Sequence, residues 1–431
     1  MASSHADWPI YLRLWTLAAA VRLLYLAAAQ PPFTLYYWDA ASSLIQFGSL
    51  ALEGVTTAAI EPLYPLFLAA VRLVAGDRPL LVQTVQTLVA SAGAVYLYKL
   101  AVALTGRRQV GTAAAMLFAV YPLLIRHSVD GTESALLTTL LIAFACRFVT
   151  MRGIVDAAAV GGWLGLAILT RVVALPLLVI VPLIASTRSR RAAIAMAGTA
   201  LLVLAPWAVR NYSLNGEVMP ARAGINLFIA NSEYSSGVIA DYGPDILLPY
   251  ARSRLAAEGL ADLPDTPRAE QQGDAAYRRL ALAQIRRHPV DTLRLKIRNV
   301  FTFFSPVLVP HRDTSAATEI RLGEDGRSTV LYSIPRPLSH RIMYSLSYSA
   351  VIALAGLGFY RRRHDLAADA ILWWVLLTFA AVHAVYFPST RYRAPVDFVF
   401  LFYAGVAVDA FVGARRRFRK ASYPRSKATA A

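Results

Sequence analysis

The sequence predicts an all-α polytopic membrane protein with about ten transmembrane helices, a long extracytoplasmic loop and amphipathic helices beside the membrane. Its 431 residues are 57% hydrophobic and only 16% charged, with a mean hydropathy of +0.48. This composition fits neither a soluble globular domain nor a disordered chain. Apolar runs near the length of about 20 residues that a membrane crossing needs alternate with arginine clusters. Such clusters are typical of short cytoplasmic loops.

The basic character of the chain indicates contact with membrane lipids and not with nucleic acid. The net charge is +17 and the pI is about 10.1. The arginines lie between the apolar runs, where cytoplasmic loops face anionic lipid. We therefore expect membrane lipids as partners and no nucleic acid. The single cysteine, Cys146, lies inside an apolar run and excludes an intrachain disulfide.

An N-terminal transmembrane module is expected over residues 1–210, with a first outer loop at 30–78. We expect its N-terminus to be retained and cytoplasmic, because this orientation puts the arginine-rich short loops inside. Its expected spans are 10–29, 80–105, 110–125, a fourth that returns to Arg147, 154–170, 172–185 and 192–209.

Hydropathy falls from 211 to 340, which indicates an extracytoplasmic loop region, and 291–308 within it is expected to form an interfacial helix. Three C-terminal spans follow within 341–413, at 343–360, 368–386 and 396–412. A basic cytoplasmic tail occupies 414–431. The sequence therefore predicts a multi-pass protein of the cell membrane with both termini cytoplasmic and its functional site extracytoplasmic.

The polar residues that remain gather on one side of the predicted membrane. The sequence has no glycine-rich phosphate loop, no His-Glu-x-x-His and no cysteine metal framework, which excludes the common soluble-enzyme templates. The gathered residues are Asp39, Glu61, Asp130, Glu133, Arg171, Arg210, Arg391 and Arg393. Ionisable groups at this depth indicate a functional site.

Asp39 follows Tyr36-Tyr37-Trp38, aromatic residues typical of the membrane interface. A carboxylate there could take a proton from an arriving hydroxyl or amine. Alternatively, Asp39 could cap a helix over residues 40–50.

Asp130 and Glu133 are three residues apart and share a face if the segment is helical. Their oxygens could hold a divalent ion, the one cofactor that the sequence suggests. Alternatively, Asp130 caps the following helix and Glu133 favours its positive end.

Arginines at the outer ends of spans oppose the usual charge bias and call for an explanation. Arg171, Arg210, Arg391 and Arg393 could bind the phosphate of a lipid carrier through their planar guanidinium groups. Alternatively, they pair with Asp39, Glu61 or headgroup phosphates. An extended conformation would aim Arg391 and Arg393 the same way, with Tyr392 opposite.

The order of these motifs resembles the C-type membrane glycosyltransferases, and more narrowly the branch of family-39-like protein mannosyltransferases and aminoarabinose transferases. The resemblance runs from about Trp15 to Val412. It depends on Asp39, Glu61-Pro62-Leu63-Tyr64-Pro65-Leu66-Phe67-Leu68-Ala69, Gly165-Leu166-Ala167-Ile168-Leu169-Thr170-Arg171, Pro206-Trp207-Ala208-Val209-Arg210-Asn211-Tyr212 and Arg391-Tyr392-Arg393-Ala394-Pro395.

The resemblance implies an inverting transferase that takes a sugar from a polyprenyl-phosphate carrier to an extracytoplasmic lipid, glycan or protein acceptor. Asp39 would be the general base. Arg391 and Arg393, followed by Arg171 and Arg210, would hold the donor phosphate. Glu61, Tyr64, Asn211 and Tyr392 are the further expected substrate contacts. The chain departs from the protein mannosyltransferases in having Ala40, not an acidic residue, after Asp39.

Two other functions compete with the transferase. A transporter or flippase of lipid-linked sugars would also need intramembrane arginines and carboxylates. Against it, the polar residues lie on one side and not at mid-membrane, and the two halves lack a matching pair of broken spans. The third candidate is an inactive relative that binds a lipid-linked sugar without transferring it.

Overall fold

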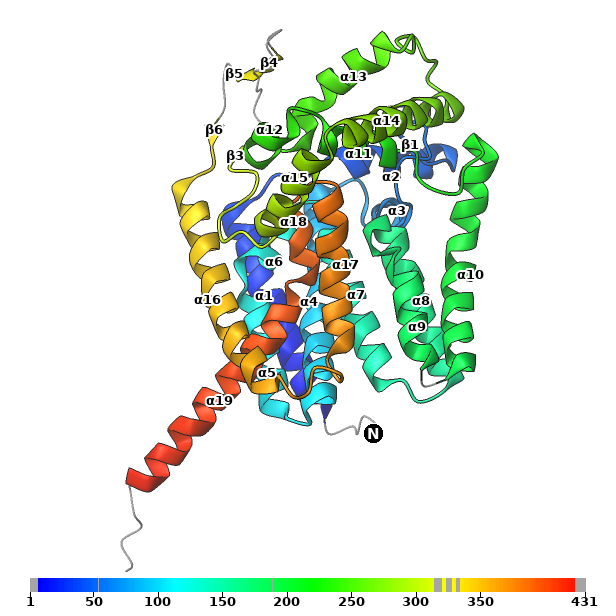
Figure 1. Cartoon of the computed structure of the whole chain (residues 1–431). Coiled ribbons are helices and arrows are strands. Elements are labelled where there is room, and N and C mark those ends of the chain that lie inside the picture. Colours follow the sequence, from blue (N-terminus) through cyan, green and yellow to red (C-terminus); the bar gives the residue numbers. More distant parts are fainter. Residues whose placement is uncertain are drawn as a thin grey trace, which may run out of the picture.

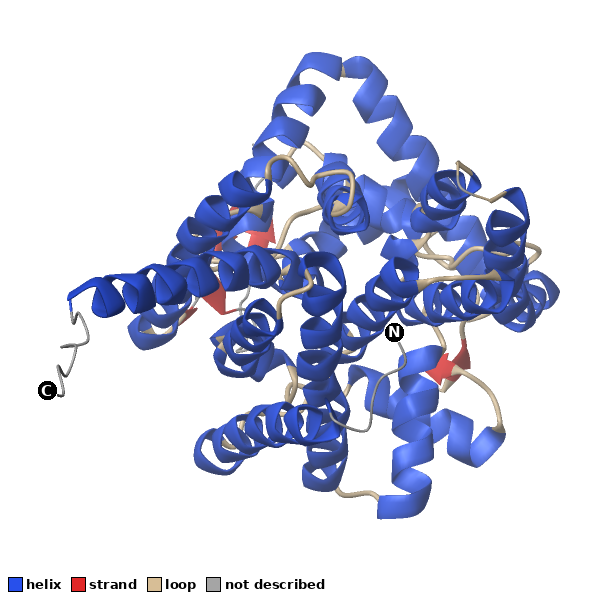
Figure 2. Cartoon of the chain, turned by 90° about the horizontal axis from the view of Figure 1, so that it is seen from below, coloured by secondary structure: helices blue, strands red, loops and turns tan. Residues whose placement is uncertain are grey.

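The computed structural model describes residues 7–52, 54–187, 189–313, 320–322, 328–330 and 334–422. Long helices run side by side through most of the molecule, and shorter helices form a layer across one end (Figure 1). Strands make up only short pieces of the described chain (Figure 2). The predicted all-α fold class is therefore confirmed.

The N-terminal half supplies most of the bundle and two short helices of the first outer loop. Its helices are α1 (Trp8–Ala29), α2 (Tyr36–Phe47), α3 (Leu63–Ala75), α4 (Pro79–Thr105), α5 (Arg108–Val120), α6 (Pro122–His127), α7 (Ser134–Thr150), α8 (Ile154–Thr170), η2 (Val172–Ala174), α9 (Leu177–Ser186) and α10 (Arg190–Asn215). Strands β1 (Ala51–Leu52) and β2 (Val55–Thr56) form an antiparallel pair in the outer loop, with Ala51 opposite Thr56.

The layer across the end of the bundle, called the cap below, consists of α11 to α15. Its elements are α11 (Ala223–Asn231), α12 (Ser235–Tyr242), η3 (Pro244–Leu247), α13 (Leu248–Ala257), α14 (Pro267–Arg287) and α15 (Pro289–Phe303). Two antiparallel strand pairs follow: β3 (Arg312–Asp313) with β6 (Ile334–Pro335), and β4 (Ile320–Leu322) with β5 (Ser328–Val330).

The chain then returns through the bundle. The last elements are α16 (Leu338–Arg362), α17 (Ala370–Val385), α18 (Thr390–Arg393), η4 (Ala394–Val396) and α19 (Phe398–Ser422). The described N-terminal end and the end of α19 both lie away from the cap (Figure 1). Of the predicted basic tail, residues 423–431 lie outside the described residues.

Every predicted span coincides with helical structure, and 154–170 has the bounds of α8. Among the described residues, five helices are long and apolar enough to cross a membrane, namely α1, α4, α10, α16 and the Phe398–Arg415 part of α19. The other expected spans fall on shorter helices. Pro122 divides the span expected at 110–125 into α5 and α6, because proline lacks the N–H that a continuous helix needs. The number of ten crossings stays a prediction.

The break at Pro122 explains an arginine inside the first span. Without an N–H at position 122, the carbonyl of Phe118 loses its helical partner. The fully buried Arg22 of α1 donates from Nη2 to Phe118 O and from Nη1 to Ala119 O, both at 3.2 Å. The guanidinium and the broken helix thus satisfy each other where no water is available.

Close helix contacts depend on small residues. Gly161 and Gly165 of α8 face α10, and a Cβ on Gly161 would lie 2.1 Å from the carbonyl oxygen of Met196. Spacing of four residues puts both glycines on one face of α8, as in membrane helix pairs that pack backbone to backbone. This contact holds α8 against α10, and Arg171 follows the C-terminal end of α8.

Candidate functional site

A cavity of about 550 Å³ lies between the bundle and the cap. Six segments far apart in the sequence line it: α2, the loop before α3, the connection from α8 to α9, α11, the start of η3 and the turn from α17 to α18. We call it the central cavity. Four of the predicted site residues line it, namely Glu61, Arg171, Arg391 and Tyr392.

The central cavity contains two arginines that share one carboxylate. Glu133 is fully buried, and it accepts hydrogen bonds from Arg171 Nη1 and, at 3.2 Å, from Arg391 Nη2. Burial alone would raise the pKa of the Glu133 carboxyl, but the guanidinium groups of Arg391 and Arg171 lower it to about 2. Glu133 is therefore ionised, and the three side chains together carry one positive charge.

Local structure aims the two guanidinium groups into the cavity. Ser389 caps α18 by accepting from Arg391 N, so residues 390–393 form a helical turn. Arg171 follows the end of α8 in an extended conformation, with φ −154° and ψ 124°. Its guanidinium lies 4.8 Å from the ring centroid of Tyr392, and that ring stacks on His383 at 4.9 Å. Tyr392 thus fixes the arginine through a cation–π contact.

One nitrogen of this cationic group lacks a partner within the described part of the chain. The buried Nε of Arg391 makes no hydrogen bond there, although the Arg391 side chain as a whole is 38% exposed. A buried N–H without an acceptor is costly. An anion with several oxygens, such as a phosphate, would supply the acceptors and match the remaining positive charge.

Glu61 has a positioning contact in the same cavity. Its Oε1 accepts from Val172 N at 3.0 Å, which ties the first outer loop to the segment after Arg171. Burial raises the pKa of the Glu61 carboxyl. Glu61 can therefore exchange a proton closer to neutral pH than an exposed glutamate.

Asp39 does not line the central cavity. It is exposed on α2 and lines a second cavity of about 590 Å³, called the side cavity, between the outer loop and α14. Because α2 begins at Tyr36, Asp39 lies in its first turn and is not the cap of a helix over 40–50, which corrects that alternative. The carboxylate faces open space, where an incoming molecule can reach it.

Arg222 joins the two cavities and was missed in the sequence. Both cavities are lined by Tyr36, Ala59 and Arg222. Arg222 Nη1 donates to the hydroxyl of Tyr36, and the guanidinium lies 5.4 Å from the centroid of that ring. The pair forms part of the wall between the cavities. Arg222 belongs to no motif and lies in a loop region rich in arginine, so the sequence carried no signal that distinguished it.

Arg393 lies apart from Arg391, which corrects the expectation that both point the same way. The expectation assumed extended structure, but α18 is helical. Arg393 is fully buried, and its Nε donates to Asp397 at 2.9 Å. Its other nitrogens donate to Phe303 O, Ser305 O and Tyr344 Oη. These contacts give Arg393 a packing role instead of the predicted phosphate contact.

Three further residues that were predicted to bind the substrates form hydrogen bonds within the protein, outside the central cavity. Arg210 donates to Leu50 O and Thr57 O, each at 3.1 Å, and so holds the first outer loop. The Oδ1 of buried Asn211 accepts from Arg210 at 3.2 Å. Buried Tyr64 donates to Gln86 Oε1 at 2.5 Å. These three residues do not line the central cavity, and their contacts hold neighbouring segments in place.

Asp130 and Glu133 do not form the metal site that was considered. The intervening Gly131 has φ +73°, so the segment is a turn and not a helix. Asp130 pairs with His127 Nδ1 at 2.6 Å and accepts from Thr132, while Glu133 faces the arginines. Within the described residues, no group of three or more His, Cys, Asp and Glu side chains could hold a metal ion.

The sequence matches one known family over part of its length. Residues 59–209, about a third of the chain, match the family described as dolichyl-phosphate-mannose-protein mannosyltransferase. No curated protein matches the chain. The family match confirms the predicted resemblance over the segment that contains Glu61, Glu133 and Arg171.

Solved structures show the same fold. The archaeal oligosaccharyltransferase AglB from Archaeoglobus fulgidus, in complex with an inhibitory peptide and a dolichol-phosphate, superposes with a TM-score of 0.54 at 13% identity. The match covers 98% of this chain and 53% of AglB, so this chain spans about half the length of that protein. The oligosaccharyltransferase from Archaeoglobus fulgidus tethered to an acceptor peptide superposes with a TM-score of 0.53 at 13% identity, and the match covers 97% of this chain and 51% of that chain. These matches confirm the predicted fold of polytopic C-type glycosyltransferases.

ArnT from Cupriavidus metallidurans bound to undecaprenyl phosphate is also similar, at 14% identity over 99% of this chain and 82% of ArnT, with a TM-score of 0.35. The Archaeoglobus oligosaccharyltransferase has also been solved in complex with Zn and sulfate.

Proposed function

We propose that this chain is an inverting glycosyltransferase that moves a sugar from a polyprenyl-phosphate carrier to an extracytoplasmic acceptor. The observation that carries the proposal is the pair Arg171 and Arg391 in the central cavity, whose guanidinium groups share the Glu133 carboxylate. Arg171, Arg391 and Glu133 together carry one positive charge, and a phosphodiester-linked sugar carries one negative charge. The family match and the dolichol-phosphate held by AglB agree with such a donor.

The arginines would act on the leaving group. Negative charge grows on the lipid phosphate as the bond from the anomeric carbon breaks, so fixed cations stabilise the transition state more than the ground state. Arg391 and Arg171 are already oriented by Glu133 and Tyr392, and little reorganisation is needed during the reaction. The attack inverts the anomeric carbon because acceptor and leaving phosphate occupy opposite sides of the sugar.

Asp39 would be the general base on the acceptor side. In the side cavity, its exposed carboxylate can accept the proton of an acceptor hydroxyl. The Tyr36–Arg222 pair lies between that cavity and the donor phosphate. The sugar must therefore pass or displace this pair to reach the acceptor, which makes the Tyr36–Arg222 pair part of the reaction path.

The sidedness is also proposed. If the cap faces the outside, then both termini and the short arginine-rich loops are cytoplasmic, as the charge bias requires. The domain limits at 210, 340 and 413 follow from the same arrangement. A donor lipid would reach the central cavity from the outer leaflet.

The test is donor-dependent sugar transfer by the purified full-length protein. First, lipid-linked sugars that co-purify with it are identified by mass spectrometry. Transfer is then measured for wild type, for Asp39→Asn and for Asp262→Asn, a matched control at another exposed aspartate. Because a general base contributes about 100- to 10,000-fold, Asp39→Asn should lose at least 100-fold in turnover with donor affinity retained.

Two outcomes would contradict the proposal. Transport of the lipid-linked sugar across vesicles without any transfer would favour a flippase. Near wild-type turnover in Asp39→Asn would exclude Asp39 as the base. Loss of activity in Asp262→Asn would show that the assay reports general damage to the cap.

A further inference from the structure

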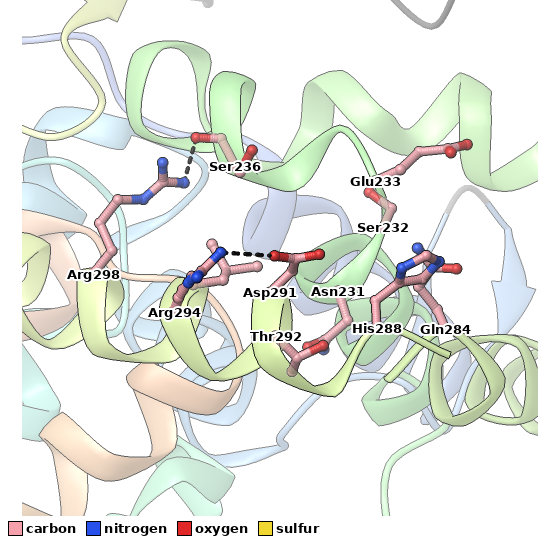
Figure 3. Close-up of a pocket in the computed structure, with 11 residues that line it drawn as sticks. Asn231, Ser232, Glu233, Ser236, Gln284, His288, Asp291, Thr292, Arg294 and Arg298 are labelled. Carbon is pink, nitrogen blue, oxygen red and sulfur yellow. Dashed lines mark hydrogen bonds and ion pairs between the residues drawn. The ribbon is translucent and has the colours of Figure 1, made fainter. Parts of the chain in front are cut away.

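A polar cavity of about 480 Å³ lies on the cap, separate from the central and side cavities. Three segments form it: the junction of α11 with α12, the end of α14 and one face of α15 (Figure 3). We call it the cap cavity. Its lining includes Asn231, Ser232, Gln284, His288 and Thr292, and Leu295 is the one aliphatic residue among the lining side chains.

The charges in the cap cavity compensate one another. Asp291 pairs with Arg294 at 3.4 Å, and Arg298 donates to the carbonyl oxygen of Ser236, as the dashed lines in Figure 3 mark. Glu233 accepts from Tyr250 Oη at 3.1 Å. Two carboxylates therefore balance two guanidinium groups. Such a lining favours neither an anion nor a cation.

One hydrogen-bond acceptor in the lining, the side-chain oxygen of Asn231, lacks a donor among the described residues. Asn231 is only 5% exposed, and its Nδ2 donates to Leu227 O at 2.7 Å while its Oδ1 has no hydrogen-bond partner among the residues that the structure describes. A buried carbonyl-type oxygen without a donor destabilises the fold. A hydroxyl that donates to Asn231 Oδ1 would recover part of this cost. Hydroxyl groups can also accept from Gln284, His288 or Thr292 in the same cavity.

The position of α15 directs the cap cavity toward water. At about 3.6 residues per turn, Asp291, Arg294 and Arg298 share one face of the helix. A different face carries Leu293, Ile297 and Phe301, which are 62%, 51% and 74% exposed. This apolar stripe suits the membrane interface, as the sequence predicted for the segment. On the polar face, the side chains of Arg294 and Asp291 are 77% and 72% exposed, so the cap cavity is open beside the apolar stripe and a water-soluble ligand can enter it.

The cap cavity is also near the side cavity that contains Asp39. Both are lined by residues of α14, Tyr277 in the side cavity and Gln284 in the cap cavity. Seven residues of α helix rise about 10 Å. A molecule with several linked units could therefore occupy the cap cavity while another unit lies near Asp39.

We propose that the cap cavity is a binding site for a neutral saccharide, namely the part of a glycan acceptor distant from the hydroxyl that reacts. Sugar hydroxyls donate and accept at once, which suits a lining of amide, hydroxyl, imidazole and paired charged groups. The identity of the acceptor as a glycan rests on the proposed transferase function. Binding at the cap cavity itself does not require transfer.

The experiment measures saccharide binding to the full-length protein in phosphatidylcholine nanodiscs by saturation-transfer NMR. The probes are neutral tetrasaccharides of mannose, glucose and galactose, with glycerol 3-phosphate as the headgroup analogue. Thr292→Trp fills the cavity from α15, and Leu293→Trp is the matched control on the exposed apolar face of the same helix. We expect at least one tetrasaccharide to bind wild type and Leu293→Trp, with at least tenfold weaker binding to Thr292→Trp.

The result is independent of catalysis because Asp39→Asn should bind the tetrasaccharide like wild type. If that variant binds but transfer is never detected, the transferase proposal fails and the saccharide site stands. No binding by any tetrasaccharide, or equal binding by Thr292→Trp in a folded sample, would refute the site. Binding of glycerol 3-phosphate alone would show a headgroup site instead. If Thr292→Trp does not fold, the double variant Gln284→Ala, His288→Ala takes its place, and we expect its affinity for the tetrasaccharide to be at least tenfold weaker than that of wild type.

Discussion

Arg391 and Arg393 are two residues apart, and the structure predicts opposite consequences when each is replaced by alanine. Arg393→Ala leaves Asp397 fully buried and without its cation. Breaking a buried ion pair in this way costs about 3 to 5 kcal/mol. Against a total stability of about 5 to 15 kcal/mol, this variant should unfold at a clearly lower temperature than wild type.

Arg391→Ala should instead affect binding. Its side chain is 38% exposed, and Glu133 keeps Arg171 as a partner after the change. The stability cost should therefore be smaller than the cost of about 3 to 5 kcal/mol for a buried carboxylate that loses its one cation. Loss of one charge-assisted hydrogen bond to the donor phosphate, worth about 1.5 to 3 kcal/mol, would weaken donor affinity roughly 10- to 150-fold.

The assay compares both variants in the same detergent samples. Thermal unfolding reports stability, and tryptophan fluorescence titration with polyprenyl phosphate reports affinity. Arg391→Lys serves as the conservative control and should recover only part of the affinity, because a point charge lacks the bidentate fork. If Arg393→Ala unfolds like wild type yet loses the lipid, the assignment of the phosphate contact to Arg391 and of packing to Arg393 is refuted.

Three further predictions test the surrounding structure. Glu133→Gln should lose roughly 2 to 3 kcal/mol of stability, and polyprenyl phosphate should stabilise this variant more than wild type by replacing the lost negative charge. The pKa of Glu133 is about 2 in the folded state and about 4.3 in the unfolded state. The difference in unfolding free energy between wild type and Glu133→Gln should therefore be largest above pH ~4.3 and should shrink as the pH falls toward 2. Chemical denaturation at pH 2–7 measures this difference, and a difference that does not change with pH would contradict the prediction. Tyr36→Phe removes the hydroxyl that accepts from Arg222 between the central and side cavities. Release of the donor sugar to water, without an acceptor, should then rise about tenfold. An unchanged rate in a mass-spectrometric hydrolysis assay would show that the Tyr36–Arg222 pair does not separate the two cavities. Cysteines at the exposed positions Glu258 and Arg152 should label from opposite sides of sealed vesicles, and labelling of both from one side would overturn the proposed topology.

The sequence by itself determined the helical framework. Apolar runs bounded by arginines placed helices at each expected span, and α8 was predicted with its observed bounds. The segment 291–308 was predicted as interfacial, and it forms α15 (Pro289–Phe303) with an exposed apolar stripe. These features depend on local periodicity and charge bias, which one stretch of sequence contains in full.

The sequence also indicated which end of the bundle would carry the site. Arg171 and Arg391 were named from their positions at span ends, Glu61 from the first outer loop and Tyr392 from the family resemblance, and all four line the central cavity. The motifs whose order resembles that of C-type glycosyltransferases contain the same four residues. Such order is a property of the linear chain and needs no contact information.

Only the tertiary structure decided which arginine meets which carboxylate. Arg391 meets Glu133 from 258 positions away, whereas Arg393 meets Asp397 one helical turn later, because Ser389 starts a helix where extended structure was expected. Asp39 proved to face a different cavity from the arginines, and Arg222 gained its place between them only through packing of the loop before α11 on α2. Pairing of this kind depends on which side chains the folded chain brings within about 4 Å, and local sequence patterns carry no information on that distance.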